Sequence, residues 1–133
     1  MTNPKLILSL LQETLAICRL DRDAGIPDWA LTGGFFSITR TPDELSIVCP
    51  QSSVPEEIPC DREWQCLRVE GPLALSLTGI LASLAAPLAR AGISTFVVST
   101  YDTDYVMVKE KDVEQAILVL SQEGHQVRRR RGG

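Results

Sequence analysis

The stretch that decides the fold is Leu77–Leu120, "LTGILASLAAPLARAGISTFVVSTYDTDYVMVKEKDVEQAILVL". In its first third, apolar side chains recur at helical spacing through Ile80, Leu84 and Leu88. This period predicts a helix over 77–92 with one buried face. Thr78 is in place to cap the start of that helix and Gly92 to end it, because these residue types are favoured at the two helix ends.

The rest of the stretch continues the alternation of strands and helices. The β-branched run "ISTFVVST" (93–100) predicts a strand, "YDTD" turns the chain, and "YVMVK" (105–109) predicts its hairpin partner. A second helical pattern covers 111–124, with a strand before the stretch at 63–71 and a short one after it at 125–129. The order β-α-β-β-α-β is the ferredoxin-like plan, an α+β fold with helices on one face of an antiparallel sheet.

The first half of the chain resembles a looser copy of this plan. "LILSLL" (6–11) and "TLAICRL" (14–20) predict one bent strand or two strands, and 35–50 predicts a hairpin turned at Thr41-Pro42-Asp43. The segment 51–60 is rich in proline and polar residues, so no more than one helical turn is expected there. We therefore expect a degenerate first module over 1–62 and a complete second module over 63–133.

The charge distribution argues against nucleic acid as a partner. The chain has 13 basic and 17 acidic residues and a net charge of -4, and four of its basic residues form the run Arg128–Arg131. The rest of the chain is strongly acidic and would repel a phosphate backbone. The arginine run is expected to be a solvated tail; the alternative is an electrostatic contact to an acidic partner, RNA or a membrane surface.

The cysteines suggest a reducing compartment rather than a metal site. Cys18, Cys49, Cys60 and Cys66 include no C-x-x-C pair, and His125 is the single histidine. We therefore expect no metal, no cofactor and a cytoplasmic location. No stretch approaches the roughly 18 apolar residues of a membrane helix, so no membrane partner is expected.

Three motifs carry a family resemblance. The helix start "TGILA" (78–82), the "PLA" at 87–89 that precedes a turn into β-branched residues, and "STYDTDY" (99–105) together resemble the ACT domain, a small ligand-sensing regulatory module. The similarity is closest to the ACT pairs of the bacterial family related to the eukaryotic CASTOR arginine sensors. It covers about 35–50 and 64–127, and it implies tandem modules that bind an amino acid or related metabolite at a module interface. The first half lacks a clear first helix and the "STYxTDY" loop. Two roles therefore stay open for it: it binds ligand itself, or it only completes the sheet and supports the second module.

The start of the first helix is the candidate carboxylate site. Unpaired N–H groups and the positive end of the helix dipole suit an anion, and Gly79 lets a ligand approach the backbone closely. Thr78, Gly79, Ile80 and Leu81 form this start. The structural alternative is an ordinary helix start with glycine in a tight turn.

The remaining candidate residues follow that helix. Ser94 and Thr95 open the next strand, beside the helix start, and the resemblance implies that they contact the ligand; the alternative is two solvated hydroxyls. Asp104 enters the returning strand, where a carboxylate is less expected, and the resemblance implies that it pairs with a ligand ammonium or guanidinium. The alternatives are capping of local N–H groups and a face that docks a partner protein. The loop itself is expected to serve turn formation or protein interaction through Ser99, Thr100, Tyr101 and Asp102.

These inferences predict a cytoplasmic, homodimeric amino-acid sensor that acts on itself or on a regulated protein partner. No nucleophile, base and acid occur at a credible spacing, so enzyme activity is not expected. The alternative function is a protein-interaction module with a vestigial pocket, in which "STYDTDY" is a docking face.

Overall fold

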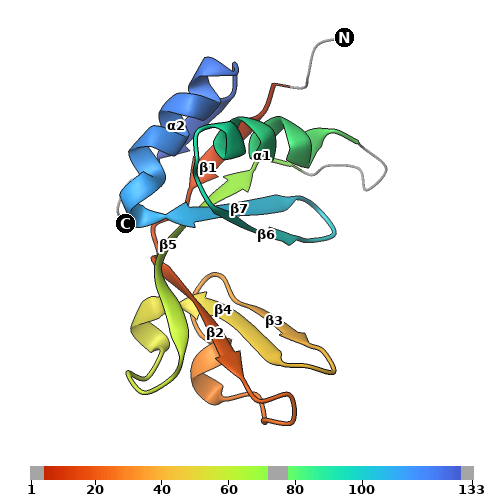
Figure 1. Ribbon diagram of the computed structural model, residues 1–133, viewed down its shortest axis with the longest axis vertical. Coiled ribbons are helices and arrows are strands. Elements are labelled where there is room, and N and C mark those ends of the chain that lie inside the picture. The colour runs from red at the N-terminus through yellow and green to blue at the C-terminus, as the bar shows by residue number, and fades with distance from the viewer. Residues whose placement is uncertain (1–4, 72–77, 130–133) are drawn as a thin grey trace. The chain divides into compact units, whose positions relative to one another are not determined.

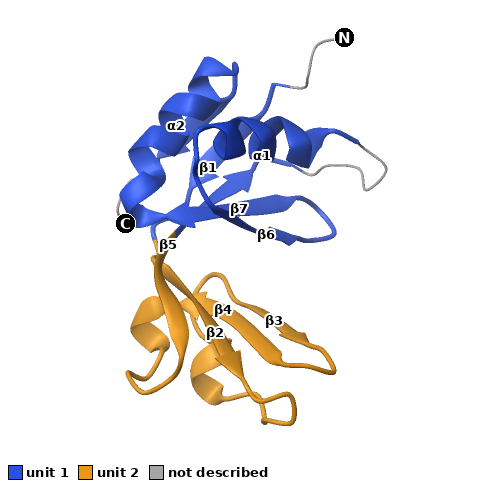
Figure 2. Ribbon diagram, in the orientation of Figure 1, with its two compact units in different colours: residues 1–12, 65–133 blue, residues 13–64 orange. Residues whose placement is uncertain are grey.

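The computed structural model describes residues 5–71 and 78–129, which fall into two compact units (Figures 1 and 2). The helical unit comprises residues 1–12 and 65–133, and the strand unit comprises residues 13–64. One strand, β5 (Cys60–Val69), begins in the strand unit and ends in the helical unit. Residues 5–12 group with the helical unit although they precede the strand unit in the sequence.

The helical unit contains the β-α-β-β-α-β series that the sequence predicts. Alongside the second half of β5, its described residues form two helices and four further strands, and a 3₁₀ turn (Glu110–Asp112) leads into the second helix. These elements are β1 (Ile7–Leu10), α1 (Ile80–Arg90), β6 (Thr95–Ser99), β7 (Asp104–Lys109), α2 (Val113–Gln122) and β8 (Gln126–Arg129).

The first strand changes the expected strand order. In the ferredoxin-like plan β8 would lie beside β5, but here β1 is inserted between them and the order is β6-β7-β5-β1-β8. Leu8 lies opposite Val69 in an antiparallel pair and opposite Val127 in a parallel pair. The β1–β8 pair is therefore a parallel pair within an otherwise antiparallel sheet. Local patterns in 6–11 indicate a strand but say nothing of its neighbours.

Both helices pack on one face of this sheet and enclose the core of the unit (Figure 1). The side chains that point inward alternate along the strands and recur at helical spacing on α1 and α2, as burial of one face requires. The core of buried residues consists of Leu6, Leu8, Leu67, Val69, Ile80, Leu84, Leu88, Ile93, Val106, Val108, Val113, Ala116 and Leu120.

The two ends of α1 differ in how they are capped. Gly92 ends the helix as predicted, with φ 76° and with the Ile93 amide donating to the Leu88 carbonyl at 3.0 Å. At the start, however, Gly79 is the N-cap with φ 80° and no side chain caps the helix, so the expected cap by Thr78 is wrong. Glycine adopts this left-handed conformation without steric cost, which lets the chain enter the helix sharply.

Pro87 and His125 form a pair that sequence patterns did not predict. Pro87 lies inside α1 and has no N–H, so the Ser83 carbonyl one turn earlier loses its helical donor. The buried His125 ring lies with Nε2 3.2 Å from that carbonyl, while its Nδ1 accepts a hydrogen bond from the Leu6 amide at 3.1 Å. Because Nδ1 accepts, Nε2 carries the proton and donates to Ser83. His125 therefore ties α1 to the start of β1.

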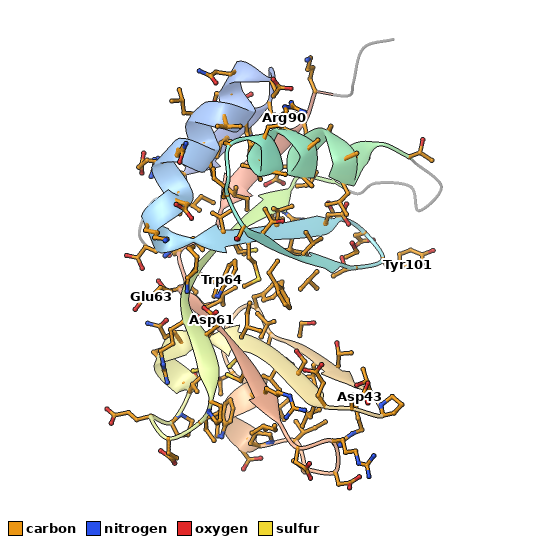
Figure 3. All side chains as sticks on the ribbon, in the orientation of Figure 1. Asp43, Asp61, Glu63, Trp64, Arg90 and Tyr101 are labelled. Carbon is orange, nitrogen blue, oxygen red and sulfur yellow. The ribbon has the colours of Figure 1, made fainter. Side chains whose placement is uncertain are left out.

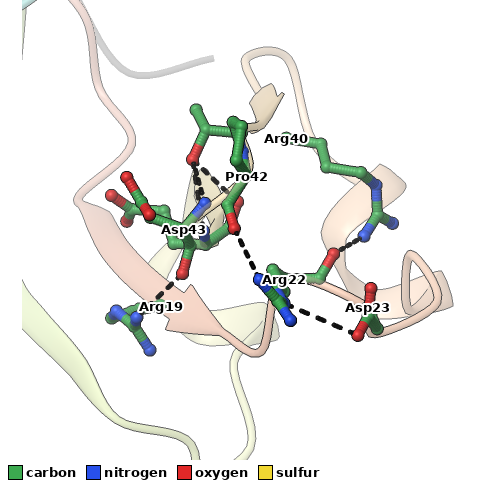
Figure 4. A network of polar contacts seen from close by, with 8 residues as sticks. Arg19, Arg22, Asp23, Arg40, Pro42 and Asp43 are labelled. Atoms are coloured by element: carbon green, nitrogen blue, oxygen red, sulfur yellow. Dashed lines mark hydrogen bonds and ion pairs between the residues drawn. The ribbon is translucent and has the colours of Figure 1, made fainter.

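The strand unit is built mainly from β-strands. The order is β3-β4-β2-β5, with β5 contributing its first half, and the hairpin 35–50 forms as predicted. Its turn is closed by the Thr41 amide, which donates to the Glu44 carbonyl at 2.9 Å, and arginines of the unit donate to carbonyls around it (Figure 4). The elements are β2 (Leu15–Leu20), a 3₁₀ turn (Asp28–Leu31), β3 (Ser37–Arg40), β4 (Leu45–Pro50) and a second 3₁₀ turn (Gln51–Ser53).

A β-bulge interrupts β5 where it leaves the strand unit. Leu15 pairs with Trp64 and Ile17 with Asp61, so β5 carries one residue more than β2 between these pairs. Glu63 takes a left-handed φ of 67° there, and its amide donates to the side chain of Gln51 at 2.7 Å. This backbone conformation costs a non-glycine residue about 1 kcal/mol or more of conformational free energy, and the bulge holds Glu63 in it.

Candidate functional site

The candidate site lies at one end of the helical unit, where β5 ends, α1 begins and the β6–β7 hairpin turns; we call this the hairpin end (Figure 1). The Thr103 hydroxyl joins two of these parts by donating to the Val69 carbonyl at 2.7 Å. Thr103 is 4% exposed although it stands in a loop. Sequence patterns do not indicate this residue, because a threonine in a turn motif gives no signal of burial.

The turn is closed by a second threonine. The Thr100 amide donates to the Thr103 carbonyl at 2.8 Å, and the Thr103 amide donates back to the Thr100 hydroxyl at 3.3 Å. Ser99 and Asp104 face each other as the last residue pair of the β6–β7 ladder. The polar residues of the motif thus fix the shape of the loop and hold Asp104 at the first position of β7.

The acidic and aromatic residues of the loop differ in exposure. Asp102 is exposed at the turn, and Tyr101 is 80% exposed and lies at the tip (Figure 3). Asp104 is half-buried. Of the two carboxylates, Asp104 is therefore the one that the fold holds in a defined place.

The start of α1 leaves its backbone accessible at the same end. Thr78 and Gly79 are exposed and Leu81 is 38% exposed, whereas Ile80 is buried in the core. Among the described residues, a Cβ added to Gly79 would meet no atom within 4 Å, so they leave the space beside its Cα open. Uncapped first-turn amides combined with open space are what an approaching anion needs.

Ser94 and Thr95 do not lie beside this helix start, and that expectation is wrong. They follow the C-terminal end of α1, and β6 runs back along the sheet toward the hairpin end. A helix of 11 residues is about 16 Å long. A single amino acid cannot span that distance within one helical unit.

A polar cluster that the sequence analysis also missed lies on the sheet. Arg68 pairs with Glu70 at 3.0 Å, and Ser9 of the neighbouring strand donates a hydrogen bond to the same carboxylate. The hydrogen bond with Tyr105, supported by the charge of Glu70, raises the pKa of the Arg68 guanidinium. Arg68 and Glu70 alternate in the sequence with Leu67 and Val69 of the core, so they lie on the sheet face that carries no helix.

Thr103 offers a test of how the hairpin end is held together. Replacement by valine, which keeps the shape but removes the hydroxyl, leaves the buried Val69 carbonyl without this donor. We expect Thr103→Val to lower the free energy of unfolding by about 1–2 kcal/mol in urea denaturation. Ser94→Ala, an exposed substitution, is the control and should change it by less than about 0.5 kcal/mol. Equal stability of the two variants would contradict this role of Thr103.

Comparison with protein families assigns the two parts of the chain separately. The ACT-domain profile matches residues 60–122, and a profile for an N-terminal domain matches residues 13–57. The human cytosolic arginine sensor for mTORC1 subunit 1 is 32% identical over 100 residues, which cover 67% of this chain and 30% of the sensor. The mouse protein of that name is 33% identical over 109 residues, covering 74% of this chain and 33% of that protein. The chain thus spans about a third of the length of these relatives.

Solved structures show the same fold over nearly the whole chain. Protein Atu0741 from Agrobacterium tumefaciens is 41% identical with a TM-score of 0.92, and the match covers 97% of this chain and 96% of that one. The regulatory subunit of aspartate kinase from Thermus thermophilus is 14% identical with a TM-score of 0.59, over 87% of this chain and 96% of the subunit. At that identity the second match shows likeness of fold alone.

Two features that would indicate a metal or a membrane partner are absent from the described residues. Within residues 5–71 and 78–129, no three histidine, cysteine or acidic side chains are arranged to hold a metal ion. None of the helices in these segments is long and apolar enough to cross a membrane.

Proposed function

This chain contains an ACT domain, matched over residues 60–122, and from that premise we propose that it is a regulatory protein that binds a free amino acid or a related metabolite. The observation that carries the proposal is the hairpin end. There the uncapped start of α1 and the half-buried Asp104 stand at the same end of one ACT unit. The arginine sensing for which the mammalian relatives are named supports an amino acid as the ligand class.

The start of α1 would receive the ligand carboxylate. Amides from Gly79 to Leu81 offer hydrogen bonds, and the helix dipole adds about 0.3–1 kcal/mol. A micromolar ligand requires about 8 kcal/mol in total. The dipole is therefore a minor term, and direct hydrogen bonds together with burial of the ligand must supply most of the affinity.

Asp104 would receive the positive end of the ligand. A charged hydrogen bond from a ligand ammonium or guanidinium to the Asp104 carboxylate contributes about 1.5–3 kcal/mol. Because Thr103 and Thr100 fix the loop before it, little conformational entropy is lost when Asp104 pairs with the ligand. The amides at the start of α1 would bind the carboxylate of the ligand, and Asp104 would bind its positive group. Together they would suit a zwitterion such as a free amino acid.

Regulation would follow through association. β6 and β8 end the sheet of the helical unit, and such edge strands favour pairing with another chain. We propose a cytoplasmic homodimer in which a second copy closes the site over the ligand, and a regulated protein as the downstream partner. We propose no enzymatic activity, since ACT domains are regulatory and the site is proposed to bind rather than to convert its ligand.

A protein-interaction module is the second candidate function, and one observation favours it. Tyr101 is 80% exposed at the tip of the hairpin, and aromatic residues are enriched at protein interfaces. In that case the loop docks onto a partner and the helix start binds nothing.

Thermal unfolding in the presence of each of the common amino acids separates the two functions. A ligand at ten times its Kd should add about 1.4 kcal/mol to the free energy of unfolding. The midpoint would then rise by about 5 °C for a domain of this size. One amino acid, or a chemically related group, should produce this shift while the others do not. A flat response to all of them would overturn the sensor proposal and leave the interaction module.

A further inference from the structure

Three of the four cysteines meet in the core of the strand unit. Cys18 of β2, Cys49 of β4 and Cys60 at the start of β5 come from three adjacent strands and pack in one cluster. Cys18 is close enough to both other thiols for each of them to affect its pKa. Cys66 lies in the other unit, and all four cysteines are free thiols.

Cys18 and Cys60 stand directly opposite each other across the β2–β5 ladder. The adjacent backbone bond, from the Arg19 amide to the Pro59 carbonyl at 3.2 Å, identifies them as a non-hydrogen-bonded antiparallel pair. In such pairs the two Cα atoms are about 4.5 Å apart. Disulfides form at Cα separations of about 4.4–6.8 Å, so this pair has the backbone spacing of a disulfide.

Cys18 and Cys49 have a less suitable placement. On the β2–β4 ladder Cys49 faces Ala16, and Cys18 faces Ile47, so the two cysteines are diagonal neighbours. Diagonal positions are about 7–8 Å apart. Residues separated by more than about 7 Å cannot be bridged unless the backbone moves.

Exposure also separates the three thiols. Cys18 and Cys49 are 1% and 0% exposed, whereas Cys60 is partly exposed. An oxidant in solution would therefore reach Cys60 first, and Cys18 is the thiol placed to react with the product.

We propose that Cys18 and Cys60 form an oxidation site, in which a hydroperoxide converts the two thiols into a reversible cross-strand disulfide. The Cys60 thiolate attacks the O–O bond of hydrogen peroxide and becomes a sulfenic acid, releasing hydroxide. The Cys18 thiol then attacks the sulfur of Cys60, the S–S bond forms, and water leaves. Overall two thiols lose two electrons and two protons, and one peroxide becomes two waters.

The surroundings set the rate and the reversibility of this step. Burial, followed by the neighbouring Cys18, raises the pKa of the Cys60 thiol, so little thiolate is present at neutral pH and oxidation is slow. Cβ atoms of a non-hydrogen-bonded pair lie near the short end of about 4.5–5.5 Å, close to the range of about 3.5–4.5 Å found in disulfides. Because Cys60 is partly exposed, a free thiol can reach the disulfide and reduce it.

Peptide mapping of the whole chain tests this proposal. The reduced protein is incubated with hydrogen peroxide, remaining thiols are blocked with an alkylating agent, and unreduced peptides are identified by mass spectrometry. We expect a peptide pair joined through Cys18 and Cys60, about 2 Da lighter than the two thiol peptides, and its loss on treatment with dithiothreitol. Cys60 found only as sulfinic or sulfonic acid, a Cys18–Cys49 link, or a link between chains would overturn the proposal.

Two alanine variants sharpen the result. Cys18→Ala should abolish the link and leave a Cys60 sulfenic acid that dimedone traps. Cys49→Ala removes an equally buried thiol from the same cluster and should keep the link. Abolition of the link by Cys49→Ala would overturn the assignment. The peptide map of the wild-type chain tests the proposal even where a variant does not fold. The outcome is independent of amino-acid binding, because this site lies wholly within residues 13–64.

Discussion

Replacement of His125 by alanine is expected to lower the free energy of unfolding by about 3 kcal/mol. The ring is 5% exposed and satisfies two backbone groups, the Leu6 amide and the Ser83 carbonyl. Each buried polar group left without a partner costs about 1–3 kcal/mol. Urea denaturation measures the loss, and Gln126→Ala, an exposed neighbour, should change stability by less than about 0.5 kcal/mol.

A double-mutant cycle with Pro87 tests the reason for this loss. Pro87→Ala restores an N–H at the position from which an α-helix supplies the donor for the Ser83 carbonyl. In that background the His125→Ala substitution should cost about 1 kcal/mol less, because one of its two orphaned groups has regained a donor. Additive effects of the two substitutions would contradict the pairing of Pro87 with His125.

Replacement of Asp104 by asparagine is expected to weaken amino-acid binding by about a hundredfold, or about 2.7 kcal/mol. Asparagine keeps the size of the side chain but cannot balance the positive charge of the ligand. Isothermal titration calorimetry with the amino acid that stabilises the wild-type chain most gives the two Kd values. The stability of the unliganded variant should stay close to that of the wild type, because no core contact is lost.

Asp102→Asn is the matched control for that experiment. It removes the same charge two residues away, at an exposed position of the same turn. Its Kd should lie within about threefold of the wild-type value, a difference of less than about 0.7 kcal/mol. Equal losses in both variants would mean that the general charge of the loop, rather than a contact made by Asp104, attracts the ligand.

The helical unit was readable from sequence because its elements are locally determined. The apolar period in α1 and α2, the β-branched run before the hairpin, and Gly92 at the helix end each act over a few residues. The resemblance in "STYDTDY" then indicated the family. The hairpin 35–50 was equally clear, because Thr41, Pro42 and Asp43 favour a turn without help from distant parts of the chain.

The features that sequence patterns missed depend on contacts between distant segments. Strand β1 lies between β5 and β8. The residue pattern of a single strand predicts that it forms a strand, but not which other strands it pairs with. The burial of Thr103 and His125 depends on partners 34 and 42 residues away. Ser94 and Thr95 were misplaced because the length of α1 separates them from its start, although they follow it closely in the sequence.

Backbone NMR of the ¹⁵N-labelled chain, titrated with the amino acid that gives the largest thermal stabilisation, tests the central claim most directly. If the ligand is held between the start of α1 and the hairpin, the amide signals of Gly79, Ile80, Leu81 and Asp104 should shift most and saturate together. Shifts concentrated at Ser94 and Thr95 or within residues 13–64, with the start of α1 unchanged, would contradict it.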